Sequence, residues 1–72
     1  SVIFEFELEH AEELKILIFD AMGRMIEQQA QQFQVGSNQL IWRPDYDLPA
    51  GMYFYSITGK RVEWSGRLMK QK

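Results

Sequence analysis

Residues 16–26 read Ile-Leu-Ile-Phe-Asp-Ala-Met-Gly-Arg-Met-Ile: an apolar run, a short polar break and a second apolar run. The first run is short and rich in strand-forming residues. In the break, Asp20 can bond the backbone two residues ahead, and Gly23 can adopt the positive φ that a tight turn needs. The stretch therefore predicts a β-hairpin, with alternate residues of its first strand on one buried face. That predicted face consists of Leu14, Ile16 and Ile18.

Strand signals continue on both sides of the hairpin. Residues 2–9 alternate apolar and acidic side chains, which indicates a half-buried strand with an acidic outer face. Residues 40–42 form a second short signal, residues 52–58 the strongest one, and residues 61–70 the last. Turn signals at intervals of about 8–12 residues separate them, at residues 10–13, 20–24, 35–38, 47–51 and 59–60.

Short strands at this spacing predict an all-β fold, an immunoglobulin-like antiparallel β-sandwich of about seven short strands. Residues 28–34 are rich in Gln and have better helix than strand propensity, but the neighbouring strands favour an extended edge segment. The chain has 72 residues, which is enough for one domain. We expect residues 1–72 to be a single domain of a longer protein, because the sequence starts in the middle of a strand pattern without Met.

Composition excludes several classes of function. The chain has no Cys, so disulfides, thiolate nucleophiles and Cys-based metal sites are excluded. Its formal net charge is −2 with both signs scattered, which argues against a nucleic-acid partner. No apolar run approaches the ~20 residues of a membrane span, so we expect no membrane insertion. We also expect no cofactor.

The candidate catalytic and metal-ligating residues have simpler interpretations. His10 is the only histidine, and no nucleophile-elbow pattern surrounds a serine, so we interpret it as a loop residue and the chain as no enzyme. Asp45 and Asp47 have the spacing of calcium ligands but lack the rest of an EF-hand loop. The acidic side chains near the N-terminus are typical of a solvated strand face that discourages aggregation; they are Glu5, Glu7, Glu9, Glu12 and Glu13.

The aromatic residues leave a choice open. In so small a domain most aromatic rings belong to the core, yet rings exposed in a row on the 52–58 strand could stack on sugars. A row of exposed rings would favour a carbohydrate- or protein-binding module appended to a secreted enzyme, and a wholly buried set would argue against such a module. The set consists of Trp42, Tyr53, Phe54, Tyr55 and Trp64.

Three stretches together resemble a known family, the type A C-terminal sorting domain of the type IX secretion system (Por secretion system). The 16–26 hairpin is similar to its strand-Asp-x-x-Gly-basic-strand pattern, residues 47–55 resemble its Leu-Pro-x-Gly-x-Tyr motif, and residues 67–72 its closing basic and apolar strand. The order and spacing cover nearly the whole chain. The sequence departs from the family pattern at two places: the polar stretch 28–34, and Trp64, which stands where a smaller polar residue is common in the family.

The resemblance implies a secretion address. The domain would sit at the C-terminus of a cargo protein of a Bacteroidetes-type bacterium. That cargo would cross the periplasm, and outer-membrane components of the type IX system would carry it to the cell surface or the medium. A sortase-like protease would then remove the domain, which catalyses nothing itself.

The resemblance also sorts the candidate site residues. Five match family motifs, and physics gives each a role in the fold: turn residues, a φ-fixing proline and a core anchor whose hydroxyl reaches a polar partner. They are Asp20, Gly23, Pro49, Gly51 and Tyr53. Three basic residues at the end, expected to be exposed, are the predicted contacts with the machinery: Arg67, Lys70 and Lys72. Dimerisation through an open edge strand stays an alternative.

Overall fold

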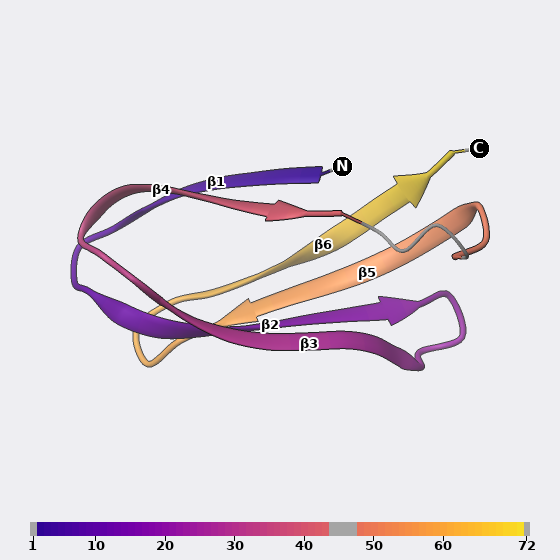
Figure 1. Ribbon diagram of the computed structural model, residues 1–72. Coiled ribbons are helices and arrows are strands. Elements are labelled where there is room, and N and C mark those ends of the chain that lie inside the picture. The colour runs from indigo at the N-terminus through magenta and orange to yellow at the C-terminus, as the bar shows by residue number, and fades with distance from the viewer. Residues whose placement is uncertain (1, 44–47, 72) are drawn as a thin grey trace.

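The computed structural model describes residues 2–43 and 48–71 and has six strands and no helix among them (Figure 1). They form two antiparallel sheets, one of two strands in the order β1-β4 and one of four in the order β3-β2-β5-β6. The predicted all-β class is therefore confirmed, while the immunoglobulin-like connectivity stays a prediction. The strands are β1 (Val2–Leu8), β2 (Glu12–Asp20), β3 (Met25–Phe33), β4 (Gly36–Trp42), β5 (Gly51–Thr58) and β6 (Glu63–Lys70).

The described residues form six strands rather than the seven expected, because the second strand of the predicted hairpin and the Gln-rich segment after it are continuous. Residues 28–33 of the Gln-rich segment continue β3 along the edge of the four-stranded sheet, where β2 supplies the hydrogen-bond partners. Residues 63–70 likewise pair with β5 as one strand. Strand pairing thus overrides the helix propensity of the glutamines, and the predicted extended edge segment is confirmed.

The core lies between the two sheets. Leu14, Ile16 and Ile18 on β2 are at most 1% exposed, as predicted for one face of that strand. From the two-stranded sheet, Leu40 and Trp42 of β4 face them and are also buried. Each fully buried aliphatic side chain contributes about 1.5–3 kcal/mol by leaving water, so this small central layer provides most of the stability.

The β2–β3 hairpin closes through the side chain of Asp20. Its Oδ1 accepts hydrogen bonds from the backbone N–H groups of Met22 and Arg24, both at 2.9 Å, and Gly23 has a φ of 86°. The pairing shifts register between Ile18 and Phe19. The predicted turn is therefore confirmed, with the Asp20 carboxylate rather than the backbone alone holding it together.

The chain crosses from one sheet to the other after β3. We expected a turn over residues 35–38, but only Val35 bends outside a strand, and β4 already begins at Gly36. The side-chain amide of Asn38 donates to the carbonyls of Gln34 and Gly36, at 2.8 and 3.0 Å. Asn38 is itself a residue of β4, and its side chain holds the bend that precedes this strand. The connection between β3 and β4 is therefore shorter than the expected turn.

Candidate functional site

The second motif turn, residues 48–51, is fastened from two directions. The hydroxyl of Tyr53 donates to the Pro49 carbonyl at 2.5 Å, and Tyr53 itself is only 4% exposed. The Lys70 ammonium, on the neighbouring strand β6, donates to the Leu48 carbonyl. Gly51 has a φ of 145°, in the region that favours glycine. Tyr53 is therefore buried with its hydroxyl bonded to the turn, and Gly51 occupies a position that a residue with a Cβ would strain.

The position of Lys70 corrects one expectation. We expected an exposed cation, but Lys70 is half-buried and its ammonium is engaged by the Leu48 carbonyl. The reason is the register of β5 and β6, which sets Lys70 opposite Gly51 and so beside the turn. Arg67 is exposed, as expected. Lys72 lies outside the described residues, as do Asp45 and Asp47 of the calcium hypothesis.

The outer face of the four-stranded sheet carries a row of side chains across all its strands. Met25 of β3 lies opposite Phe19 of β2, Phe19 opposite Phe54 of β5, and Phe54 opposite Arg67 of β6. Met25 is 52% and Phe54 42% exposed. We call these four residues the outer row. They give this end of the sheet an apolar band that ends in a cation.

A shallow hollow of about 490 Å³ accompanies the outer row where Phe54 meets Arg67. Residues from β2, β5 and β6 line it, so it exists only when these three strands are paired. A surface of this kind suits an apolar side chain of a partner next to an acidic one, since Arg67 stands at its rim.

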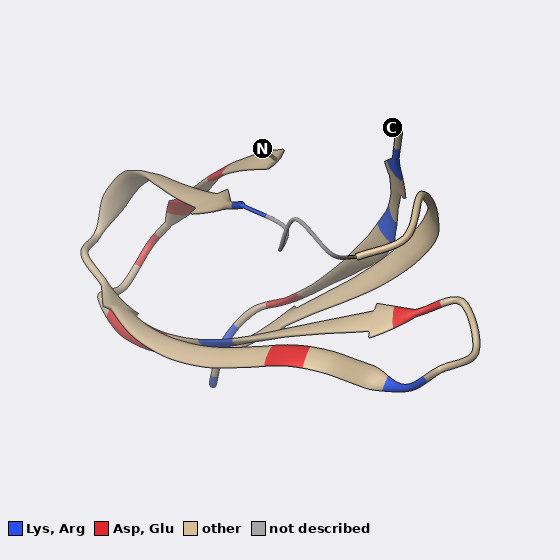
Figure 2. Cartoon of the chain, turned by 45° about the vertical axis from the view of Figure 1, so that its right-hand side comes forward, with Lys and Arg blue, Asp and Glu red and all other residues tan. Residues whose placement is uncertain are grey.

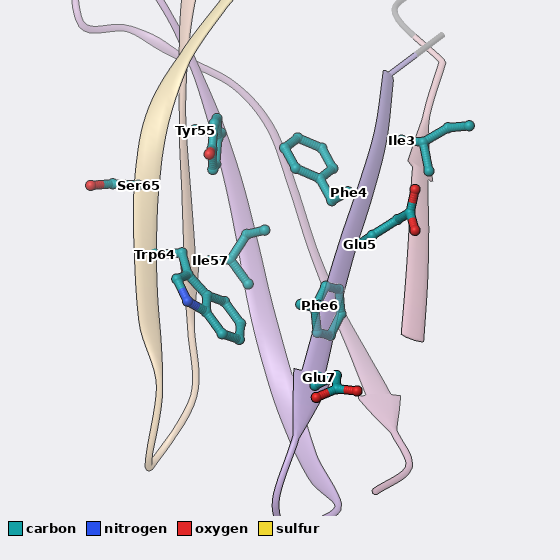
Figure 3. Close-up of a pocket in the computed structure, with 9 residues that line it drawn as sticks. All are labelled: Ile3, Phe4, Glu5, Phe6, Glu7, Tyr55, Ile57, Trp64 and Ser65. Carbon is teal, nitrogen blue, oxygen red and sulfur yellow. The ribbon is translucent and has the colours of Figure 1, made fainter. Parts of the chain in front are cut away.

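Aromatic rings lie on the inner face of β1, the face that is turned toward the four-stranded sheet. Phe4 packs edge-on against Tyr55 with ring centroids 4.8 Å apart, and Phe6 lies 5.4 Å from Trp64. These rings border a hollow of about 510 Å³ between β1 and the β5–β6 pair, which Figure 3 shows from one side. Phe6 also packs edge-on against the buried ring of Phe33, with the ring centroids 5.1 Å apart.

Of the aromatic set defined from the sequence, Phe54 alone is exposed. Trp42 and Tyr53 are buried and face each other with centroids 6.4 Å apart, while Tyr55 and Trp64 are half-buried and line the hollow. These five residues therefore form no row of exposed rings on β5, the feature that would have favoured a sugar-binding module.

The charged side chains of β1 are all acidic, whereas β2 and β6 carry charges of both signs (Figure 2). Glu5 and Glu7 point outward from β1, as the alternation of the sequence predicts, and both are exposed. Ile3, on the same face, is also exposed, at 53%. Arg67 and Lys70 lie on β6. His10 lies in the β1–β2 connection and is exposed.

The hairpin turn contains an acid with a lowered pKa, Asp20. The backbone N–H of Arg24 holds the pKa of the Asp20 carboxyl below its ordinary value of 3.8, and the Arg24 side chain and the Met22 N–H act in the same direction. The Arg24 side chain is 75% exposed, so this ion pair adds little stability. The hydrogen bonds that lower this pKa are the same ones that close the turn.

The described residues also contain no cluster of three His, Asp or Glu side chains arranged to hold a metal ion. No helix long and apolar enough to cross a membrane occurs in the same residues. The described residues bring together four features: two braced turns, the outer row, and the hollow lined by Phe4, Phe6, Tyr55 and Trp64, which we call the aromatic hollow.

Comparison with known families gives these surfaces a context. The sequence model of the secretion system C-terminal sorting domain matches residues 2–71, nearly the whole chain. The chain belongs to this family. The sorting domain is the C-terminal signal of type IX secretion, so it addresses a cargo to the cell surface or the extracellular space and interacts with the type IX machinery. No curated protein and no solved structure matches the chain.

Several residues of the sorting domain escaped the sequence analysis. Glu27 accepts a hydrogen bond from the Trp42 indole at 2.9 Å and so links β3 to β4. Phe19 and Met25 complete the outer row. Their alternation with buried neighbours places them outward, but only the pairing of β2 with β5 reveals that they join Phe54 and Arg67.

Proposed function

We propose that residues 1–72 are a non-catalytic sorting signal that is read by type IX outer-membrane components through the outer row and the adjoining part of β6. The cargo precedes the domain, crosses the periplasm with it and is released when a sortase-like protease cuts between them. The family match supports the role of secretion address. The observation that supports this particular surface is the apolar band of Met25, Phe19 and Phe54, which ends at Arg67.

The three basic residues then have different roles. Arg67 is exposed at the rim of the hollow and is the candidate contact with an acidic side chain of the machinery. Lys70 acts through the fold, since its ammonium holds the turn at Leu48. Lys72, which lies outside the described residues, stays a candidate contact as a basic residue.

A localisation assay tests this function. A fluorescent reporter with a periplasmic signal is fused ahead of residues 1–72 and expressed in a bacterium with an intact type IX system and in a strain without its outer-membrane pore. We expect reporter at the surface or in the medium only in the intact strain. Reporter retained in the periplasm of both strains would contradict the sorting function.

Charge variants test the surface. Arg67→Glu should lower the exported fraction about fivefold, because one contact of roughly 1 kcal/mol is lost. Lys15→Glu is the matched control: Lys15 is exposed on the same sheet face, at the other end of β2, and gives the same charge change. Equal export of both variants would exclude Arg67 as a contact. Unfolding curves of the two purified domains should agree within about 0.5 kcal/mol.

A further inference from the structure

The aromatic hollow runs along the edge of β1, not merely beneath it. Its lining includes Phe4 and Phe6, which point inward, and Glu5 and Glu7, which point outward. Successive side chains of a strand lie on opposite faces, so a hollow that touches both sets must pass along the strand's edge. On β6 the same holds for inward Trp64 and outward Ser65 in the lining (Figure 3).

The edge along this hollow has unused pairing capacity. In the described part of the chain β1 pairs with β4 alone, and β6 with β5 alone. Every second residue of β1 therefore directs its backbone N–H and C=O toward the hollow. A strand that entered there would extend the two-stranded sheet and would place alternate side chains among Phe4, Tyr55 and Trp64.

The charges on β1 decide which strand fits. Side chains of an added strand that point outward would lie beside Glu5 and Glu7 on the outer face. Opposite charges on neighbouring strands attract, and like charges repel. A second copy of β1 would bring its own glutamates next to these, so pairing of β1 with β1 is disfavoured. An outward row of Lys or Arg is the complementary choice.

We propose that β1 receives an extended segment of the export machinery by strand addition, and that this segment alternates apolar side chains, which fill the hollow, with basic side chains beside Glu5 and Glu7. This inference rests on the proposed sorting function for its partner. In strand addition, main-chain hydrogen bonds provide the affinity, and the alternating side chains provide the specificity.

The first test uses a defined probe, a capped peptide of the length of β1 that alternates Lys and Val. We expect it to bind the 72-residue chain at peptide concentrations up to about 1 mM, with slowed hydrogen exchange at β1 amides. Two further versions of the peptide carry N-methyl groups on every second amide. In one version the methyl groups block the N–H groups of one strand edge, and in the other version those of the opposite edge. At least one of them should lose binding. Binding of both, or no binding of the unmethylated peptide at this concentration, overturns the proposal.

Charge swaps test the selectivity. Glu5→Lys should weaken binding of the Lys–Val peptide about fivefold, and the Glu5→Lys, Glu7→Lys double variant should instead favour a Glu–Val peptide. Glu13→Lys is the control, because Glu13 is exposed on β2, away from the hollow, and gives the same charge change. Equal weakening by Glu13→Lys would mean a general charge effect and would overturn the proposal.

The reporter assay separates this inference from the sorting function. If the unchanged domain is exported and the Glu5→Lys, Glu7→Lys variant is held back, while Glu13→Lys is exported, strand addition at β1 is supported. Export of the double variant at the unchanged level overturns strand addition and leaves the sorting function intact. Failure of the unchanged domain overturns the sorting function, while the peptide result is unaffected.

Discussion

The two long sides of the sandwich differ in how they are closed. On the β3–β4 side, the chain itself crosses between the sheets, and the Trp42 indole donates to the Glu27 carboxylate at 2.9 Å. On the β1–β6 side, the two strands belong to different sheets, and the rings of Phe6 and Trp64 approach each other beside a hollow of about 510 Å³. One side therefore carries stability and the other keeps backbone groups and apolar surface available for a partner.

This difference explains why the motif residues are poor guides to recognition. Asp20, Gly23, Pro49, Gly51 and Tyr53 all belong to turns or to their bracing. A change at any of them acts on the fold first. The surfaces suited to a partner, the outer row and the β1 edge, lie on strands instead.

The strongest test of the comparison replaces one tryptophan on each side. Trp42→Ala should cost about 3–5 kcal/mol of unfolding free energy, because a buried ring and its hydrogen bond are lost. Trp64→Ala should cost about 1–3 kcal/mol, since half-buried Trp64 faces the hollow. Urea unfolding followed by circular dichroism measures both. An equal or greater loss at Trp64 would mean that the open side is as important for stability as the closed one.

A second test overfills the open side. A Cβ at Gly66 would lie 2.7–2.8 Å from the Tyr55 ring and hydroxyl, so Gly66→Val should cost about 1–3 kcal/mol. Adding Tyr55→Leu should restore part of that loss, because the obstructing ring is removed. The adjacent exposed residue gives the control, Ser65→Val, with a change near zero in the same thermal unfolding assay. No rescue by Tyr55→Leu would show that the strain lies in the backbone.

A third test compares two hydroxyl groups. Tyr53→Phe removes the hydrogen bond to the Pro49 carbonyl and should cost about 0.5–1.5 kcal/mol. Tyr55→Phe removes a hydroxyl for which the described residues supply no hydrogen-bond partner, so its cost should be close to zero. Denaturant unfolding of both variants measures the two losses of unfolding free energy. If Tyr55→Phe proved the more harmful, the bracing of the 48–51 turn would not depend on Tyr53.

The smallest effect is expected at the hairpin turn. The folded state lowers the pKa of Asp20, so its contribution is present above the ordinary value of 3.8 and is lost as pH falls through the lower folded value. Asp20→Asn should therefore reduce the melting temperature slightly at neutral pH, and the difference from the unchanged domain should vanish in acid. Thermal scans across the acid range measure it. A difference that persists at the lowest pH would assign the effect to geometry instead of charge.

Local chemistry made the hairpin and the class of fold predictable. Asp20 and Gly23 mark their turn, and the alternation of Leu14, Ile16 and Ile18 marks a buried face, all within a few neighbouring residues. The assembly of the surfaces was not predictable, because it depends on which strands pair and in what register. Lys70 shows this most clearly: its partner at Leu48 is distant in the sequence and adjacent only through the β5–β6 ladder.

The place of β6 in the sheet has a consequence for timing during synthesis. Among the described strands β6 is made last, yet it supplies Arg67 to the outer row and the Lys70 ammonium to the turn before β5. A ribosome that stalls before Arg67 releases a chain with neither feature. If the machinery recognises the proposed surface, we expect a chain truncated before Arg67 to be exported poorly, because it would lack both features.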